Sequence, residues 1–186
     1  HWVLSNDPEP YESWGNGSAM RVSPVGWMAR SLQEALDEAE RSAEVTHNHP
    51  EGIKGAKAVS SAIFLLRAGG GKEDISDYVS SQFGYDLDRT LDGIRPSYAF
   101  DVSCQGSVPE AFIAFLESTD FEDAIRNAIS LGGDSDTIAC ITGSLAHAYY
   151  REIPEWMVNY TLEVLDRSLH PMLEDFWKKY PPELNP

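Results

Sequence analysis

The sequence predicts an all-α protein, a compact bundle of about eight helices joined by short loops. Apolar residues recur at helical spacing along most of the chain, and helix-capping residues precede these segments. Alternating strand patterns bounded by hairpin turns are absent from the sequence. Because 186 residues with 42% hydrophobic composition suffice for one core, we expect a single domain over residues 1–186.

The first half of the chain predicts three helices. Ser31 stands three residues before Glu34 in a capping-box pattern, ahead of an apolar stripe at helical spacing. The stripe consists of Leu32, Ala35, Leu36, Ala39 and Ala43. The next helix is predicted to begin at Pro50 and to stop at the glycines of 69–71. A shorter helix is expected in the segment EDISDYVSSQFG.

The second half predicts the remaining helices. SVPEAFIAFLEST indicates a helix with Ser107 as its N-cap and Pro109 early in its first turn. Asp120 is expected to cap the helix of DFEDAIRNAISLGG. Two amphipathic segments, PEWMVNYTLEVLDRSL and HPMLEDFWKKY, close the chain, and PPELNP is expected to be a frayed tail.

The stretch LGGDSDTIACITGSLAHAYY holds more polar groups at a helix start than capping requires. Asp134, Asp136 and Thr137 are hard oxygen donors of the kind that suits Mg²⁺, Mn²⁺ or Ca²⁺ rather than zinc. With Asp134 before the helix and the other two in its first turn, their side chains could converge on one point. The alternative is that one aspartate caps the helix, the other complements its dipole, and nothing binds.

The helix that follows carries small residues on about one face. Ala139, Gly143 and Ala146 would let another backbone come close, and a mid-helix glycine costs about 1 kcal/mol relative to alanine. This pattern predicts tight packing that places the two carboxylates at the centre of the bundle.

The segment WGNGSAMR indicates a glycine-rich turn. Gly15, Asn16, Gly17 and Ser18 precede a helical segment expected to begin near Ala19. Exposed N–H groups at such a turn can hold a phosphate without a basic side chain. The alternative is an ordinary loop and N-cap.

Histidine and cysteine give weaker signals. His47 and His49 are at the spacing of surface-loop residues before a proline, and a single histidine donating a hydrogen bond to a ribose or phosphate is favoured over metal ligation by the pair. Cys104 and Cys140 form neither a metal-type spacing nor a disulfide framework, so both are expected to be reduced and buried.

The charge balance restricts the partners. With 30 acidic and 14 basic residues the formal charge is -16, which excludes nucleic acid as an expected partner. A phosphate-bearing small molecule then requires bound cations or aligned N–H groups. No apolar run is long enough for a membrane span and no leader pattern opens the chain, so we expect a soluble, cytoplasmic protein.

Four stretches resemble successive motifs of the ADP-ribosylglycohydrolase family. They are GNGSAMR, THNHPEGIKGA, CQGSVPEAFIAFLE and LGGDSDTIACITGSLAHAYY, in the family's order. The resemblance implies the family's all-α orthogonal bundle around a binuclear Mg²⁺ site, with Mn²⁺ as an alternative ion. It also implies hydrolysis of the bond between ADP-ribose and an acceptor, so the expected partner is ADP-ribose or an ADP-ribosylated substrate.

The same resemblance implies roles for particular residues. Asp134, Asp136 and Thr137 would be metal ligands, with Asp136 bridging the two ions, and His47 would contact the ligand. The diphosphate and the neighbouring ribose would lie on Gly15, Asn16, Gly17, Ser18, Ala19 and Met20.

The chain departs from the family near its beginning. Family members carry there a second acidic metal motif and an acidic catalytic residue, and neither is present in this sequence, which starts at His1. We therefore expect an N-terminally incomplete domain, with a hydrolase as the parent protein and half a metal site in this chain, inactive or impaired alone.

Two other readings remain at the level of sequence. One is a relative that keeps the fold but has lost catalysis, either an ADP-ribose-binding protein or a crystallin-like structural one. The other is a nucleophilic hydrolase using Cys104 and His47, which would be inactivated by thiol alkylation and indifferent to chelators. The sequence identifies neither the acceptor nor the oligomeric state.

Overall fold

The computed structural model describes Leu4 and residues 8–181. Over these residues the fold is all-α, with eleven α-helices and no strand, as predicted. In chain order the helices are α1 (Gly17–Arg21), α2 (Ser23–Met28), α3 (Leu32–Glu44), α4 (Pro50–Arg67), α5 (Lys72–Phe83), α6 (Leu91–Ile94), α7 (Cys104–Leu116), α8 (Phe121–Ser130), α9 (Ser135–Tyr150), α10 (Glu155–Val164) and α11 (His170–Lys179). The prediction of about eight was low because α1, α2 and α6 are too short to show helical periodicity.

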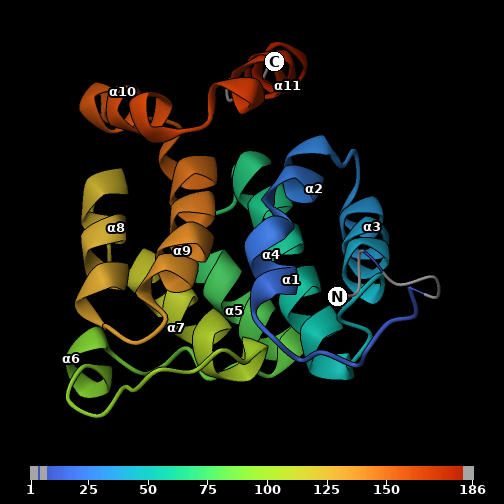
Figure 1. The fold of residues 1–186 in the computed structure, drawn as a ribbon. Coiled ribbons are helices and arrows are strands. Elements are labelled where there is room, and N and C mark those ends of the chain that lie inside the picture. The colour runs from blue at the N-terminus through green and yellow to red at the C-terminus, as the bar shows by residue number, and fades with distance from the viewer. Residues whose placement is uncertain (1–3, 5–7, 182–186) are drawn as a thin grey trace.

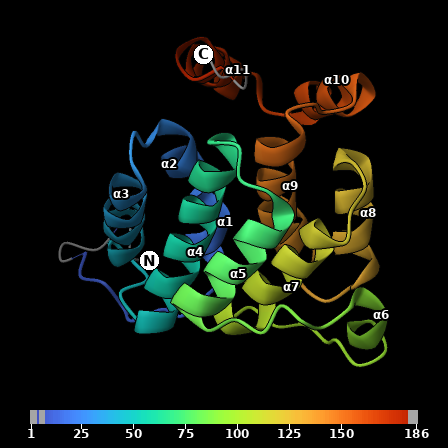
Figure 2. The ribbon, with the colours of Figure 1, turned by 180° about the vertical axis from the view of Figure 1, so that it is seen from behind.

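Helix α4 forms the centre of the bundle and packs on α1, α2, α3, α5, α7 and α9 (Figures 1 and 2). Two close approaches depend on glycine. A Cβ on Gly26 of α2 would lie 2.7 Å from the Ser60 carbonyl oxygen, and one on Gly55 of α4 would lie 2.5 Å from the Cys104 Sγ. These two crossings bring backbones together at the core.

The predicted close approach on α9 is not what the structure shows. Gly143 faces side chains of α8, and a Cβ there would meet the Ile125 Cδ1 at 3.0 Å rather than a neighbouring backbone. Asp134 is half-buried and Asp136 is exposed, so the carboxylates lie at one end of the bundle and not at its centre. Small residues on a helix face leave room that the large side chains of a neighbouring helix can fill as readily as a neighbouring backbone can.

Two helix starts agree with the sequence. The Ser31 hydroxyl accepts a hydrogen bond from the Glu34 N–H at 3.1 Å, and the Asp120 carboxylate accepts one from the Asp123 N–H at 2.8 Å. Both bonds satisfy an N–H group that the first turn of a helix leaves without an internal partner.

The predicted start of α7 was wrong by one turn. Its N-cap is Ser103, whose hydroxyl accepts from the Gly106 N–H at 3.1 Å, and Pro109 lies inside the helix. Ser107 is a buried helical residue whose hydroxyl donates to the carbonyl oxygens of Asp101 and Ser103 at 2.9 and 2.8 Å. The extra turn forms because a second serine upstream supplies the cap.

The two cysteines differ in burial. Both are free, and Cys104 is buried as expected, whereas Cys140 is exposed, which corrects the prediction. The Cys140 thiol donates to the Met20 carbonyl oxygen at 3.6 Å, so it lies on the side of α9 that faces α1.

Helices α10 and α11 lie beyond one end of the bundle, opposite the end that carries α6 (Figures 1 and 2). None of the residues 155–164 or 170–179 is buried. Both amphipathic segments were predicted, while residues 182–186 of the expected tail lie outside the described part of the chain. Across the described residues, no helix is both long and apolar enough to cross a membrane.

Candidate functional site

The site begins at the turn that leads into α9. Gly132 and Gly133 adopt φ values of +72° and +62°, which favour glycine. A Cβ on Gly133 would also lie 2.7 Å from the Tyr98 ring. This turn places Asp134 at the N-cap of α9 and Asp136 and Thr137 in its first turn, as predicted.

Asp134 does not act as a capping residue. Within the described part of the chain, its side chain makes no capping bond to the α9 amides. Its Oδ2 instead accepts a hydrogen bond from the Asn16 side-chain amide at 2.6 Å. The alternative in which Asp134 only caps α9 is therefore not supported, because its carboxylate bonds to another segment of the chain.

The glycine-rich turn and the aspartate turn meet although they are 118 residues apart. The Asn16 amide nitrogen bridges the Asp134 carboxylate and the Ser107 hydroxyl, the latter at 2.9 Å. Asn16 and Ser107 are both buried, at 7% and 0% exposure. A buried amide with two acceptors in place is held in one orientation, so it fixes the position of Asp134.

Backbone pairing holds the glycine-rich turn beside the start of α7. Gly15 and Ser103 form an isolated antiparallel bridge, the Asn16 N–H donates to the Val102 carbonyl at 2.8 Å, and the Cys104 N–H donates to the Trp14 carbonyl at 2.9 Å. Sequence reasoning missed this pairing because each partner lies in a loop without a strand pattern.

The six residues proposed for the diphosphate are not equivalent. Helix α1 begins at Gly17, two residues earlier than expected. Ser18 and Ala19 are buried, and the Ser18 hydroxyl donates to the Gly52 carbonyl at 2.7 Å. Met20 is partly exposed and its Sδ receives a weak 3.7 Å hydrogen bond from the Thr137 hydroxyl, which joins the two turns a second time.

His47 lies beside the glycine-rich turn and not in a surface loop. It is 8% exposed, and its Nε2 is 3.4 Å from where a Cβ would stand on either Gly15 or Gly17. Its Nδ1 is 2.6 Å from the Thr46 hydroxyl. Burial, and then the positive charge of Arg21, lower the pKa of His47, so the ring is neutral at pH 7.

His49 has a different role from His47. Its Nδ1 accepts the Glu51 N–H at 3.1 Å and so caps α4, and its ring meets the edge of the Trp14 ring at 5.7 Å. The two histidines therefore do not converge on one point.

The electrostatic surroundings of the aspartate turn are negative. Burial first, and then the carboxylates of Glu110, Asp101 and Asp134, raise the pKa of Tyr98 to about 12. The Tyr98 hydroxyl donates to the Gly106 carbonyl at 2.9 Å. A cation near Asp134 would be stabilised by this field.

The donor set fits a hard divalent cation in part. Two carboxylates and a hydroxyl are oxygen ligands of the type that Mg²⁺ takes. Among the residues that the structure describes, the Thr137 hydroxyl bonds only to a thioether sulfur, a weak acceptor. Among the described residues, however, no group of three or more His, Cys, Asp or Glu side chains is placed to hold a metal ion. Three such side chains would be too few to complete the shell of an octahedral ion, which takes about six donors.

Cys104 does not have the properties of a nucleophile. It is fully buried at the start of α7, and burial raises the pKa of its thiol to about 11. Its Sγ donates to the Gly15 carbonyl oxygen at 3.2 Å. A thiol in this environment stays protonated at pH 7, so the geometry opposes the alternative that pairs it with His47.

The fold and the site together define an all-α protein in which a glycine-rich turn and an oxygen-donor turn meet at one end of a helical bundle. The chain belongs to the ADP-ribosylglycohydrolase family, whose profile matches residues 1–184.

Individual relatives agree with this assignment. Human ADP-ribosylhydrolase ARH3 is 28% identical over 210 residues, covering 85% of this chain and 58% of that protein. The ADP-ribosylarginine hydrolase Tri1 of Pseudomonas putida is 30% identical over 170 residues, covering 84% of this chain and 44% of its own. A solved structure titled as an ADP-ribosylglycohydrolase-related protein complex matches with a TM-score of 0.72 at 27% identity, over 94% of this chain and 63% of that one. The chain thus spans about half the length of the relatives it matches.

Proposed function

We propose that the protein to which this chain belongs is a Mg²⁺-dependent hydrolase that cleaves the glycosidic bond between ADP-ribose and an acceptor. The observation that carries the proposal is the contact of Asn16 with Asp134, which brings the glycine-rich turn and the oxygen-donor turn together. Membership of the ADP-ribosylglycohydrolase family supports the reaction class.

In this proposal Asp134, Asp136 and Thr137 hold the Mg²⁺, for which Mn²⁺ could substitute. The ion would orient the ribose and polarise the scissile bond when bound. Asn16 keeps the Asp134 carboxylate in place through a 2.6 Å hydrogen bond. The buried Asn16 amide leaves this carboxylate little freedom to turn away, so the ligand geometry is set before the ion binds.

The glycine-rich turn would receive the diphosphate, and His47 the adjoining ribose. The ring of His47 already stands against Gly15 and Gly17, where any larger residue would meet it. Because the protein has a formal charge of -16, an anionic ligand needs a local source of positive potential. Backbone N–H groups at the start of α1 and a bound divalent cation supply it in this scheme.

We further propose that this chain by itself binds the ligand without turning it over. Octahedral Mg²⁺ takes about six donors, and Asp134, Asp136 and Thr137 provide three. The relatives are about twice as long as the matched part of this chain, so the remaining donors and the catalytic acid or base would come from a part without a counterpart here.

The first test is calorimetric titration of the chain with ADP-ribose, with and without Mg²⁺, beside the same titrations of Asp136→Ala. We expect binding that requires Mg²⁺ and falls at least tenfold in the variant, since a metal ligand is lost. Asp175→Ala, which removes an exposed carboxylate of α11, is the matched control and should bind as the parent chain does. Binding that is unchanged in Asp136→Ala, or equal without Mg²⁺, would contradict the metal role.

The second candidate is an ADP-ribose-binding or crystallin-like relative without catalysis, which the small donor set favours. The two differ in the full-length protein. A hydrolase releases ADP-ribose from an ADP-ribosylated peptide in the presence of Mg²⁺, and chelation stops the release. A binding protein retains Mg²⁺-dependent affinity but releases nothing, and a structural relative does neither.

A further inference from the structure

A cleft is lined in part by Tyr98, whose ring also lies against Gly133 of the aspartate turn. Its volume is about 680 Å³, and it is formed by α6, the segment 95–101 and the first turns of α7. This is within the range of about 300–1,000 Å³ that is usual for ligand sites. Gly133, next to Asp134, packs on the Tyr98 ring and on the Ala99 carbonyl, so one wall is shared with the candidate site.

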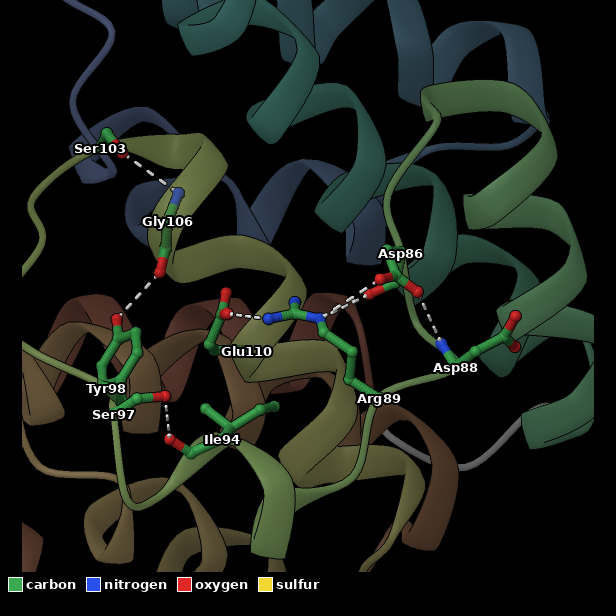
Figure 3. A network of polar contacts seen from close by, with 9 residues as sticks. All are labelled: Asp86, Asp88, Arg89, Ile94, Ser97, Tyr98, Ser103, Gly106 and Glu110. Atoms are coloured by element: carbon green, nitrogen blue, oxygen red, sulfur yellow. Dashed lines mark hydrogen bonds and ion pairs between the residues drawn. The ribbon is translucent and has the colours of Figure 1, made fainter.

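The floor of this cleft contains a buried carboxylate with an unsatisfied oxygen. Glu110 is 5% exposed, and its Oε1 accepts a 2.7 Å hydrogen bond from Arg89 (Figure 3). Its buried Oε2 has no hydrogen-bond partner among the residues that the structure describes. A buried oxygen of this kind destabilises the fold unless a donor reaches it, so this position calls for a donor that the described residues do not supply.

Arg89 shows what kind of donor the carboxylate accepts. Its guanidinium closes over Glu110 and also contacts Asp86, with Nε 3.7 Å from the Oδ2 (Figure 3). The side chain is 37% exposed, whereas that of Glu110 is 6% exposed. The guanidinium can therefore move toward solvent while the carboxylate stays fixed.

The remaining walls favour a cation. Asp88 and Asp101 also line the cleft, so Arg89 neutralises only one of three carboxylates. Phe100 also lines the cleft and is 69% exposed, so its ring is accessible to a planar cation. A guanidinium forms two parallel hydrogen bonds with a carboxylate and stacks on aromatic rings, which an ammonium group does less well.

We propose that this cleft binds an arginine side chain of the protein substrate that lies near the ADP-ribosylated residue, with Glu110 as its carboxylate partner. The guanidinium of the substrate arginine replaces that of Arg89 and reaches the Glu110 Oε2. This inference rests on the proposed function, because it makes the cleft an extension of the ADP-ribose site toward the polypeptide part of the substrate.

The test is nuclear magnetic resonance titration of the isotopically labelled chain with N-acetyl-arginine amide. We expect amide shifts at residues 98–101 and around Glu110. The uncharged analogue N-acetyl-citrulline amide should cause none, and N-acetyl-lysine amide should bind more weakly. Glu110→Gln should weaken arginine binding about tenfold, the loss of one charge-assisted hydrogen bond pair. Arg89→Gln, which removes the competing guanidinium, should strengthen it.

Two controls make the outcome decisive. Glu122→Gln neutralises a carboxylate that pairs with Arg126 on the surface of α8 and should leave arginine binding unchanged. The double variant Arg89→Gln/Glu110→Gln removes the buried charge together with its partner, so it tests the cleft without an unpaired arginine.

Absence of shifts at residues 98–101, equal shifts with the citrulline analogue, or arginine binding that survives Glu110→Gln would each overturn the proposal. A parallel titration with ADP-ribose, followed at Gly15 to Ala19, reports on the proposed function separately. If ADP-ribose binds and arginine does not, the proposed function is retained and the proposal for the cleft is contradicted.

Discussion

The two ends of α9 differ in how they are held. At its start, Asp134 is fixed by a buried amide from a segment far away in the sequence, and the neighbouring turns are joined by backbone hydrogen bonds. Beyond its end, α10 and α11 have no buried residue in 155–164 or 170–179, and several of their large apolar side chains are exposed. The candidate site is therefore built into the bundle, while the terminal helices are added to its opposite end.

Ring contacts provide the link between α11 and the bundle. The His147 ring near the end of α9 lies 5.1 Å from the Trp27 ring and 5.2 Å from the Trp177 ring of α11. We therefore expect changes at the start of α9, where the candidate site lies, to alter ligand binding and global stability together. Changes at exposed positions of α10 and α11 should affect only the attachment of the terminal helices.

The largest expected effect concerns the core. Phe112→Ala in α7 removes a fully buried ring and should lower the free energy of unfolding by about 3–5 kcal/mol, measured by urea denaturation. Trp156→Ala in α10, where the residue is 56% exposed, should change it by less than about 0.5 kcal/mol. A comparable loss in both variants would show that α10 is packed in solution, which would contradict the difference between the bundle and the terminal helices.

The next effect is a dependence on pH at the end of α9. Burial lowers the pKa of His147 from 6.5 to about 4, so the unfolded chain takes up the proton first as the pH falls. Its contribution to stability is complete above pH 6.5 and is lost as the pH approaches 4. The loss should be on the order of 2–3 kcal/mol.

His147→Phe keeps an aromatic ring between the two tryptophans and removes the titration. Urea unfolding across this pH range should show a smaller decrease in the variant, with a remainder from His47, whose pKa is also lowered. An identical decrease in both proteins would mean that His147 is already exposed to water, and that α11 does not cover it.

A smaller effect is expected at the start of α9, where the candidate site lies. Ser107→Ala removes the hydroxyl that accepts from Asn16, and Ser61→Ala removes an equally buried hydroxyl bonded only to carbonyls of its own helix. Each should cost about 1 kcal/mol in urea denaturation. We expect only Ser107→Ala to weaken Mg²⁺-dependent ADP-ribose binding, because Asn16 then loses one of the two partners that orient it toward Asp134. Equal binding by both variants would remove Ser107 from the site.

The sequence predicted the parts of the fold that depend on local interactions. The caps at Ser31 and Asp120 were predicted correctly because a helix start is determined within about four residues. Ser107 was wrongly assigned as a cap because two serines precede the same apolar run. Ser103 accepts the Gly106 N–H as the cap, whereas Ser107 donates to the carbonyls of Asp101 and Ser103.

The site was predicted in its components but not in its assembly. Asp134, Asp136 and Thr137 were identified by their residue types, and the structure brings Met20 and Asn16 to them. Nothing near Asn16 in the sequence shows that its amide reaches Asp134, and the burial of His47 depends on the same long-range packing. The roles of these site residues in metal and ligand binding stay predictions until the titrations described above are done.

The pairing of Gly15 with Ser103 has a consequence for the order of events during synthesis. The helices of the first half can form as soon as they are made, but the backbone pairing of the glycine-rich turn and the Asn16–Ser107 hydrogen bond wait for the start of α7. The hydrogen bond between the Asn16 amide and Asp134 waits longer, until the start of α9 has been translated. Contacts between such distant residues are slow to close. The ligand site should therefore be among the last parts of the chain to form on the ribosome, and a nascent chain that ends before α9 should have no affinity for ADP-ribose.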